Sequence, residues 1–235
     1  MRRPPEEIPD MLQHWFIGWA ALRAYPTSWA SGHPAARRRE RASGWEFFIG
    51  NPAPLDLAAL AAVAADSPDS VLSVWGPDVQ RYVDQAHLAG LSLVSTAETL
   101  MELDLSGADA EDPYLADPEF TLATARVGGR HDSSDAVARY ATTIRTGQTL
   151  AAWGTVAVVG DAAVFDQLQT SPDFRRRGFG RMVVDALTAR ALDHSVQRGL
   201  LLASPAGQTM YTRLGWHVVC PVTILAAPSA APVAE

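Results

Sequence analysis

The stretch from Ala163 to Val184 has the sequence AVFDQLQTSPDFRRRGFGRMVV. It starts as an apolar strand, passes through a turn that contains Arg175, Gly178 and Gly180, and continues directly into a helix. Backbone N–H groups at a helix N-terminus have no partners, and about half a positive charge resides there. Glycines let a phosphate approach the backbone, and arginines add cationic donors. The stretch therefore predicts a pyrophosphate-binding turn between a strand and a helix.

Strands and helices alternate along the rest of the chain. Residues 31–44 predict a solvated loop or a frayed helix end. Strands that alternate with helices of this length indicate an α/β fold with crossover connections. Helices are expected at 10–24, 55–65, 77–89, 134–146, 179–197 and 206–213, and strands at 45–49, 70–75, 92–105, 120–127, 149–159, 162–170, 199–204 and 216–225.

Two distant segments, 70–105 and 199–225, share one order of features. Each has an apolar strand, a turn with a proline, a helix that contains a tyrosine, a glycine and a second strand. A decayed internal duplication explains this order.

Composition excludes several classes of protein. With 48% hydrophobic and 19% charged residues among 235, the chain is an ordinary globular protein. It has no lysine, which excludes a pyridoxal phosphate Schiff base and a Walker-type phosphate lysine. Its one cysteine, Cys220, cannot form an internal disulfide, so we expect a reducing cytoplasm. The six histidines show no metal-ligand spacing, so we expect no metal.

Charge is divided unevenly along the chain. Residues 1–112 hold 8 Arg and 16 Asp and Glu, a net charge of −8, whereas residues 113–235 have a net charge of +1. An acidic first half argues against nucleic acid there and favours a cationic ligand. The apolar stretch at 11–22 is too short to span a membrane.

The order and spacing of two motifs identify a family resemblance. Residues Arg175 to Gly180 match the Arg/Gln-x-x-Gly-x-Gly/Ala signature of the GCN5-related N-acetyltransferase (GNAT) superfamily, after the short Pro-Asp turn that the family usually has. Residues 201–216, with Tyr211 and the Gly215-Trp216 step, are similar to its second conserved block. The resemblance is strong over 149–225, fainter over 113–148 and only topological over 45–105.

This resemblance implies a fold and a division of the chain. The expected fold is a mixed central sheet flanked by helices. Residues 1–112 would form a degenerate GNAT-like lobe without an Arg-x-x-Gly-x-Gly run, 113–225 the acetyl-CoA-binding catalytic domain, and 226–235 a flexible tail.

The resemblance also implies a set of site residues. The strands at 162–170 and 199–204 would splay apart to admit the pantetheine arm of acetyl-CoA, and backbone N–H groups in the glycine turn would hold its pyrophosphate. Tyr211 would stand near the sulfur and protonate the departing thiolate. The implied cofactor-binding residues are Leu168, Thr170, Arg175, Arg176, Arg177, Gly178, Phe179, Gly180, Arg181 and Ser204.

The sequence does not assign the general base. The family often has a glutamate early in the strand before the turn, where this chain has Val164. Asp166 lies two residues on, hence on the same face of the strand. It is either a base that acts through water or an anchoring carboxylate at the strand edge. Ser204 also departs from the family's common asparagine, which leaves one hydrogen bond to the cofactor open.

The resemblance implies acetyl transfer from acetyl-CoA to a primary amine of a small molecule. Acetylation of a protein or peptide, and a coenzyme A-binding module without catalysis, stay open as alternatives. The expected partner is a small-molecule amine, with no nucleic acid and no membrane. A homodimer is left open.

Overall fold

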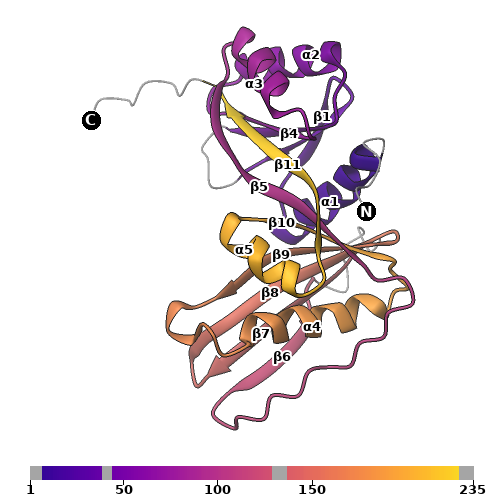
Figure 1. The fold of residues 1–235 in the computed structure, drawn as a ribbon, viewed down its shortest axis with the longest axis vertical. Helices are drawn as coiled ribbons and strands as arrows, with labels where there is room; N and C mark the ends of the chain where they lie inside the picture. The colour runs from indigo at the N-terminus through magenta and orange to yellow at the C-terminus, as the bar shows by residue number, and fades with distance from the viewer. Residues whose placement is uncertain (1–6, 39–43, 129–136, 228–235) are drawn as a thin grey trace.

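The computed structural model describes residues 7–38, 44–128 and 137–227. The tail predicted at 226–235 lies outside these ranges except for its first two residues. All the strands described belong to one mixed sheet of eleven strands (Figure 1). They are β1 (Thr27–Ala30), β2 (His33–Arg37), β3 (Trp45–Gly50), β4 (Val71–Trp75), β5 (Ser92–Asp104), β6 (Thr121–Arg126), β7 (Ala138–Thr146), β8 (Thr149–Val159), β9 (Ala162–Thr170), β10 (Arg198–Ala203) and β11 (His217–Ala226).

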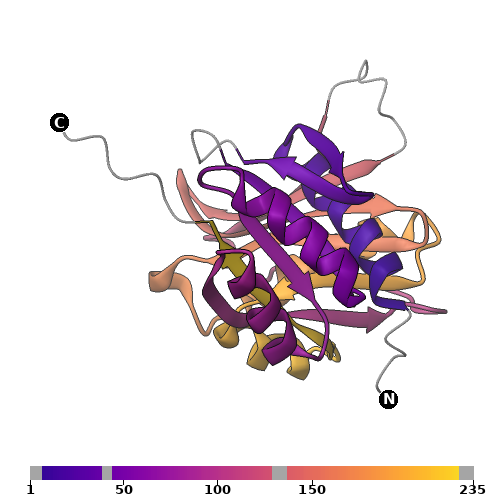
Figure 2. The ribbon, with the colours of Figure 1, turned by 90° about the horizontal axis from the view of Figure 1, so that it is seen from above.

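Five α-helices in the described ranges cover this sheet, which confirms the α/β class. As the sequence predicts, helices form the crossover connections between parallel strands: α2 connects β3 to β4, and α4 connects β9 to β10. One helix packs on one face and four on the other (Figures 1 and 2). They are α1 (Ile8–Arg23) on the first face, and α2 (Pro54–Ala65), α3 (Val79–Leu88), α4 (Phe179–Leu192) and α5 (Pro205–Arg213) on the second.

The order of strands in the sheet is β1-β2-β3-β4-β11-β5-β10-β9-β8-β7-β6. In its central part, the order β3-β4-β11 from one side corresponds to β9-β10-β5 from the other. The parallel pair β3–β4 in the first half corresponds to the parallel pair β9–β10 in the second. Strand β11 pairs antiparallel with β4, just as β5 pairs antiparallel with β10. Each half therefore receives one strand from the other, and the duplication expected from the sequence is visible as an internal symmetry.

Alternation along the strands divides the core between the two faces. On the α1 face, a cluster of aromatic rings surrounds Trp15, whose ring stacks on Trp19 and meets the edge of Trp75. The sequence predicts α1 from the spacing of Trp15 and Trp19, which lie on one stripe of the helix. On the other face, α4 and α5 pack on β7 to β10, and α2 and α3 pack on β3, β4 and β11.

Two secondary-structure predictions are wrong. Within the helix expected at 134–146, residues 138–146 are strand β7, in which Thr142 and Ile144 are buried and Thr143 and Arg145 more exposed. The Thr142 hydroxyl lies 2.8 Å from that of Thr124 on β6, and the β-branched residues of β7 favour a strand. Residues 31–37, expected as part of a loop at 31–44, are the turn and second strand of a hairpin of β1 and β2, closed by Ser31 and Gly32, which both have positive φ. Residues 39–43 of that loop and 134–136 of that helix lie outside the described residues. Helix α4 also ends at Leu192, before the predicted 197.

The described ranges contain no helix that is long and apolar enough to cross a membrane. They also contain no group of three or more His, Cys, Asp or Glu side chains that could hold a metal ion.

Candidate active site

The parallel strands β9 and β10 separate near the middle of the second half. Their residue pairs run only from Ala162 with Arg198 to Val164 with Leu200. Strand β9 nevertheless continues to Thr170. The backbone edge of β9 that faces β10 is therefore unpaired with β10 beyond Val164, and this opening is the splay that the family resemblance implies.

A bulge in β9 marks the place where the strands part. Gln167 has a φ of +56°, and the register between β8 and β9 shifts between Thr155 with Asp166 and Trp153 with Gln169. A bulge bends its strand and increases the local twist. It turns the end of β9 away from β10 while β9 stays paired with β8.

The turn after β9 presents its backbone toward the opening. A short 3-10 helix, η2 (Pro172–Phe174), follows β9, and Gly178 then adopts a φ of +81° at the N-cap of α4. The first N–H groups of α4 after Gly178 have no partner inside the helix. The sequence forms this turn because glycine accepts a left-handed conformation without steric cost.

Gly180 lies where three elements meet. A Cβ at Gly180 would lie 3.3 Å from Met210 Sδ on α5 and 3.3 Å from Thr170 Oγ1 on β9. At Gly178, in contrast, no atom lies within 4 Å of a Cβ position. The glycines thus bring the start of α4, the end of β9 and α5 close together and leave the N-cap open.

The four predicted arginines surround this turn with exposed side chains. Arg175 Nε donates to Thr170 O at 3.4 Å, and Arg181 Nε lies 3.2 Å from Asp185 Oδ2. The Arg177 guanidinium stands 5.7 Å from the Phe120 ring centroid and 5.8 Å from that of Phe174. The site therefore combines a helix N-terminus, backbone donors and positive charge, and these residues fit a pyrophosphate.

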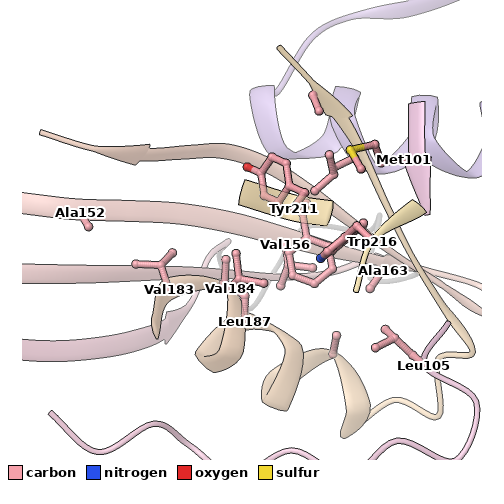
Figure 3. Packing of buried hydrophobic residues seen from close by; sticks show 14 of the residues in the cluster. Met101, Leu105, Ala152, Val156, Ala163, Val183, Val184, Leu187, Tyr211 and Trp216 are labelled. Atoms are coloured by element: carbon pink, nitrogen blue, oxygen red, sulfur yellow. The ribbon is translucent and has the colours of Figure 1, made fainter. Parts of the chain in front are cut away.

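Tyr211 is buried on α5 beside the opening, with 6% of its surface exposed. Its ring meets Trp216 edge-on at 5.9 Å, and Figure 3 shows its hydroxyl turned away from Trp216. Burial, with a smaller contribution from the negative charge of Asp166, raises the pKa of Tyr211 to about 12. The hydroxyl therefore stays protonated at neutral pH and holds a proton that it can donate.

Asp166 lies on the other side of β9, toward α1. Arg23 at the end of α1 binds both of its carboxylate oxygens, with Nε to Oδ2 at 2.6 Å and Nη2 to Oδ1 at 3.0 Å. Val164 is fully buried against Gly18 of α1, so no carboxylate occupies the position where the family often has its base. Of the two roles left open for Asp166, this geometry favours the anchoring carboxylate.

The comparisons with known proteins agree with this geometry. The family described as FR47-like protein matches residues 144–222, which contain the opening, the glycine turn and Tyr211. A GCN5-related N-acetyltransferase from Kribbella flavida superposes with a TM-score of 0.62 over 99% of this chain and 98% of that chain, at 16% identity. The chain has a GCN5-related N-acetyltransferase fold.

Other structures with the GNAT fold are similar to this chain. A tandem GNAT protein from the clavulanic acid biosynthesis pathway gives a TM-score of 0.62, with 13% identity over 84% of this chain and 79% of that chain. A GCN5-related N-acetyltransferase from Sphaerobacter thermophilus gives 0.56, with 10% identity over 84% and 78%. No curated protein sequence matches the chain significantly. The resemblance predicted from the arginine and glycine run is confirmed at the level of the fold.

Within the GNAT fold, the structure assigns local contacts to three residues of the predicted set. Ser204 is the N-cap of α5, and its Oγ accepts a hydrogen bond from Gly207 N at 3.3 Å. The Ser-Pro pair at the start of the helix is a signal for this cap. Phe179 buries its side chain in the core and contributes backbone to the turn. Leu168 packs partly against the same core and lies beyond the last residue pair with β10.

Sequence reasoning missed Arg23 and Met210. Neither has a local signal, because Arg23 lies 143 residues from Asp166 along the chain and Met210 meets Gly180 only through tertiary packing.

Proposed function

We propose that this protein transfers an acetyl group from acetyl-CoA to a primary amine of a small molecule. The observation that carries the proposal is the opening between β9 and β10 beside the glycine turn of Gly178 and Gly180. An unpaired strand edge offers main-chain partners to an extended amide chain, and the turn offers donors to a pyrophosphate. Coenzyme A carries both groups in that order.

The residues divide the binding of acetyl-CoA between them. The backbone N–H groups from Arg176 to Arg181 and the exposed arginines hold the pyrophosphate, and Leu168 and Thr170 bind the pantetheine arm through their main chain. Ser204 stands at the opposite wall of the opening, at the end of β10. When it is bound, acetyl-CoA supplies an acetyl group activated as a thioester.

Tyr211 provides the proton that the leaving thiolate needs. Its raised pKa makes it a weak acid, but the same burial disfavours a thiolate, whose pKa near 8.5 applies to water. Position therefore matters more than acidity, and the location of Tyr211 on α5, the helix that follows β10 and contacts the glycine turn through Met210, supports this role. General acid catalysis of this kind is worth about 10²–10⁴-fold in rate.

The experiment that tests the proposal measures release of free thiol from acetyl-CoA with a panel of amines, peptides and antibiotics. Thiol release with small amines supports the proposal, and release with peptides alone favours the peptide alternative. A thermal shift with coenzyme A but no thiol release with any acceptor leaves only the binding module. If coenzyme A gives no thermal shift and no acceptor releases thiol, then small-amine acetylation, peptide acetylation and the binding module are all excluded.

A further inference from the structure

Four carboxylates lie on the α1 face of the sheet. They are Asp166 on β9, Glu98 and Glu102 on β5, and Glu46 on β3. Side chains two positions apart in a strand share a face. Each carboxylate has a neighbour two positions away in the cluster around α1, which puts all four on that face: Val164 for Asp166, Leu100 for Glu98 and Glu102, and Phe48 for Glu46.

Three of these carboxylates have a partner. The fully buried Glu102 lies between two partners: His217 Nε2 is 3.2 Å from its Oε2, and Arg198 Nη1 is 3.9 Å from its Oε1. Asp166 accepts two hydrogen bonds from Arg23. Glu46 accepts a bond from Arg38 Nη1 at 3.0 Å and a second from Ser73 Oγ at 2.9 Å. In each pair an arginine stands beside the carboxylate that it binds.

Glu98 is the carboxylate left over. In residues 7–38, 44–128 and 137–227 no hydrogen bond or ion pair to its side chain is found. Its side chain is only partly exposed, and burial raises its pKa while the more distant Arg38 lowers it. Because a partly buried carboxylate gains from a cationic partner, Glu98 is suited to a positively charged ligand.

Glu98 lies at the rim of the opening. The last pair between β10 and β5 joins Ala203 to Thr99, so Glu98 is the first residue of β5 beyond the end of β10. Gln208 of α5 donates to Thr99 Oγ1 at 2.8 Å, which ties this part of β5 to the helix that carries Tyr211. Thr99 and Tyr211 belong to the α5 face, and Glu98 to the opposite one.

The two faces of the opening therefore have different chemistry. The glycine turn, Met210 and Tyr211 occupy the α5 face, where the coenzyme would enter. An acceptor that approaches from the side opposite the coenzyme comes from the face that carries Asp166 and Glu98. A monoamine has its only nitrogen at the thioester, so it has no second ammonium group to pair with Glu98.

We propose that Glu98 is a specificity-determining residue that binds a second ammonium group of the acceptor, so that diamines and polyamines are preferred to monoamines. This inference rests on the function proposed above. The transfer forms an N–C bond at the acceptor's other nitrogen and breaks the C–S bond of the thioester. Tyr211 gives a proton to the sulfur, and the proton that the nitrogen loses restores the Tyr211 hydroxyl through solvent. Glu98 touches none of these atoms.

The test compares two acceptors with the same four-carbon chain, putrescine and butylamine, with the wild type, Glu98→Gln and Glu111→Gln. Glu111 is exposed between β5 and β6, next to Asp112, which pairs with Arg190 near the end of α4 that is remote from the glycine turn. Its substitution changes the net charge equally. We expect the wild type to prefer putrescine by tenfold or more in kcat/KM. In Glu98→Gln this preference falls by about tenfold to a hundredfold, mostly through KM, as for a lost charge-assisted hydrogen bond. Glu111→Gln keeps the preference for putrescine.

Two further measurements separate the possible failures. Glu98→Asp keeps the charge and should keep a preference for putrescine, which a purely steric role would not predict. Coenzyme A should stabilise all variants equally in a thermal shift assay. Equal kcat/KM for the two acceptors in the wild type, or an unchanged preference in Glu98→Gln, overturns the role of Glu98 while thiol release still supports acetyl transfer. Loss of the thermal shift in the wild type overturns both proposals.

Discussion

The two halves of the sheet use the same parallel pair in different ways. In the first half, β3 stays paired with β4 up to Gly50 with Trp75, and Asn51 N donates to Trp75 O beyond that pair. In the second half, pairing of β9 with β10 stops at Val164 with Leu200. The same arrangement of strands is therefore closed in one half and open in the other. A ligand site in this fold depends on lost pairing, which leaves backbone groups free.

The connections from these strands to the next helix also differ between the two halves, in length and in composition. Three residues join β3 to α2, whereas eight join β9 to α4. The short connection contains one proline and no arginine, and the fully buried Trp75 is the β4 residue paired with Gly50 at the end of β3. The long connection has room for the glycine turn. This difference explains why only the second half is expected to bind coenzyme A.

The largest expected effect comes from separating the halves. Strand β5 lies between β10 and β11, so a fragment of residues 113–235 would lack a central strand of its own sheet. Leu100 and Met101 of β5 are fully buried, and their absence exposes apolar core. We expect no cooperative unfolding transition and no stabilisation by coenzyme A, measured by circular dichroism and thermal shift. A fragment that unfolds cooperatively would show that the domain boundary predicted at 112 separates independent units.

Gly180→Asp should remove coenzyme A binding. The new side chain would crowd Met210 and Thr170 and put a negative charge beside the pyrophosphate. In the wild type, coenzyme A at 100 times its Kd stabilises the fold by about 2.7 kcal/mol, and the variant should show no such shift. Leu55→Asp is the matched control, because the exposed Leu55 occupies the same position, second in the helix, in α2. Equal shifts in both variants would contradict the difference between the halves.

Tyr211→Phe should lower kcat by about 10²–10⁴-fold and leave the acceptor KM near its original value. The phenyl ring keeps the edge contact with Trp216, so the fold and the affinity for coenzyme A should change little. The control is Tyr82→Phe in α3, the corresponding helix of the closed half, which should leave kcat unchanged. A decrease smaller than about threefold in Tyr211→Phe would mean that water supplies the proton.

Asp166→Asn should destabilise the protein by about 1–2 kcal/mol, because it weakens the ion pair that joins β9 to α1 and both side chains are partly exposed. Arg23→Gln should have a similar effect, measured by urea unfolding. If Asp166 instead acts as the base, Asp166→Asn lowers kcat by 10²-fold or more and Arg23→Gln does not. This pair of variants therefore decides between the two roles.

The smallest effect concerns long-range charge. The net charge of −8 on the first half should attract a cationic acceptor, so kcat/KM for the acceptor should fall severalfold as ionic strength rises from about 0.01 to 0.15 M. Acetyl-CoA must be saturating at each salt concentration, because salt also weakens pyrophosphate binding. A constant kcat/KM would show that the first half does not steer the acceptor.

Predictions from the sequence are confirmed where a local signal is strong, as in the glycine turn and the aromatic stripe of α1. The splay of β9 from β10 is implied by the family resemblance and has no local signal. The sequence does not predict the hairpin of β1 and β2 although its Ser31-Gly32 pair is a turn signal, because the arginines after it indicate a solvated segment. The alanines and arginines of β7 favour a helix, whereas pairing with β6 and β8 decides its structure.

The sequence by itself determined which half has the turn for a pyrophosphate, because backbone conformation at Gly178 and Gly180 depends on residues a few positions apart. It also determined that two similar segments exist. Only the tertiary structure decided that these segments exchange β5 and β11, that Arg23 binds Asp166, and that Glu98 stands at the rim of the opening. These contacts join residues that are distant in the chain, and their free energy comes from strand pairing and burial that no local pattern encodes.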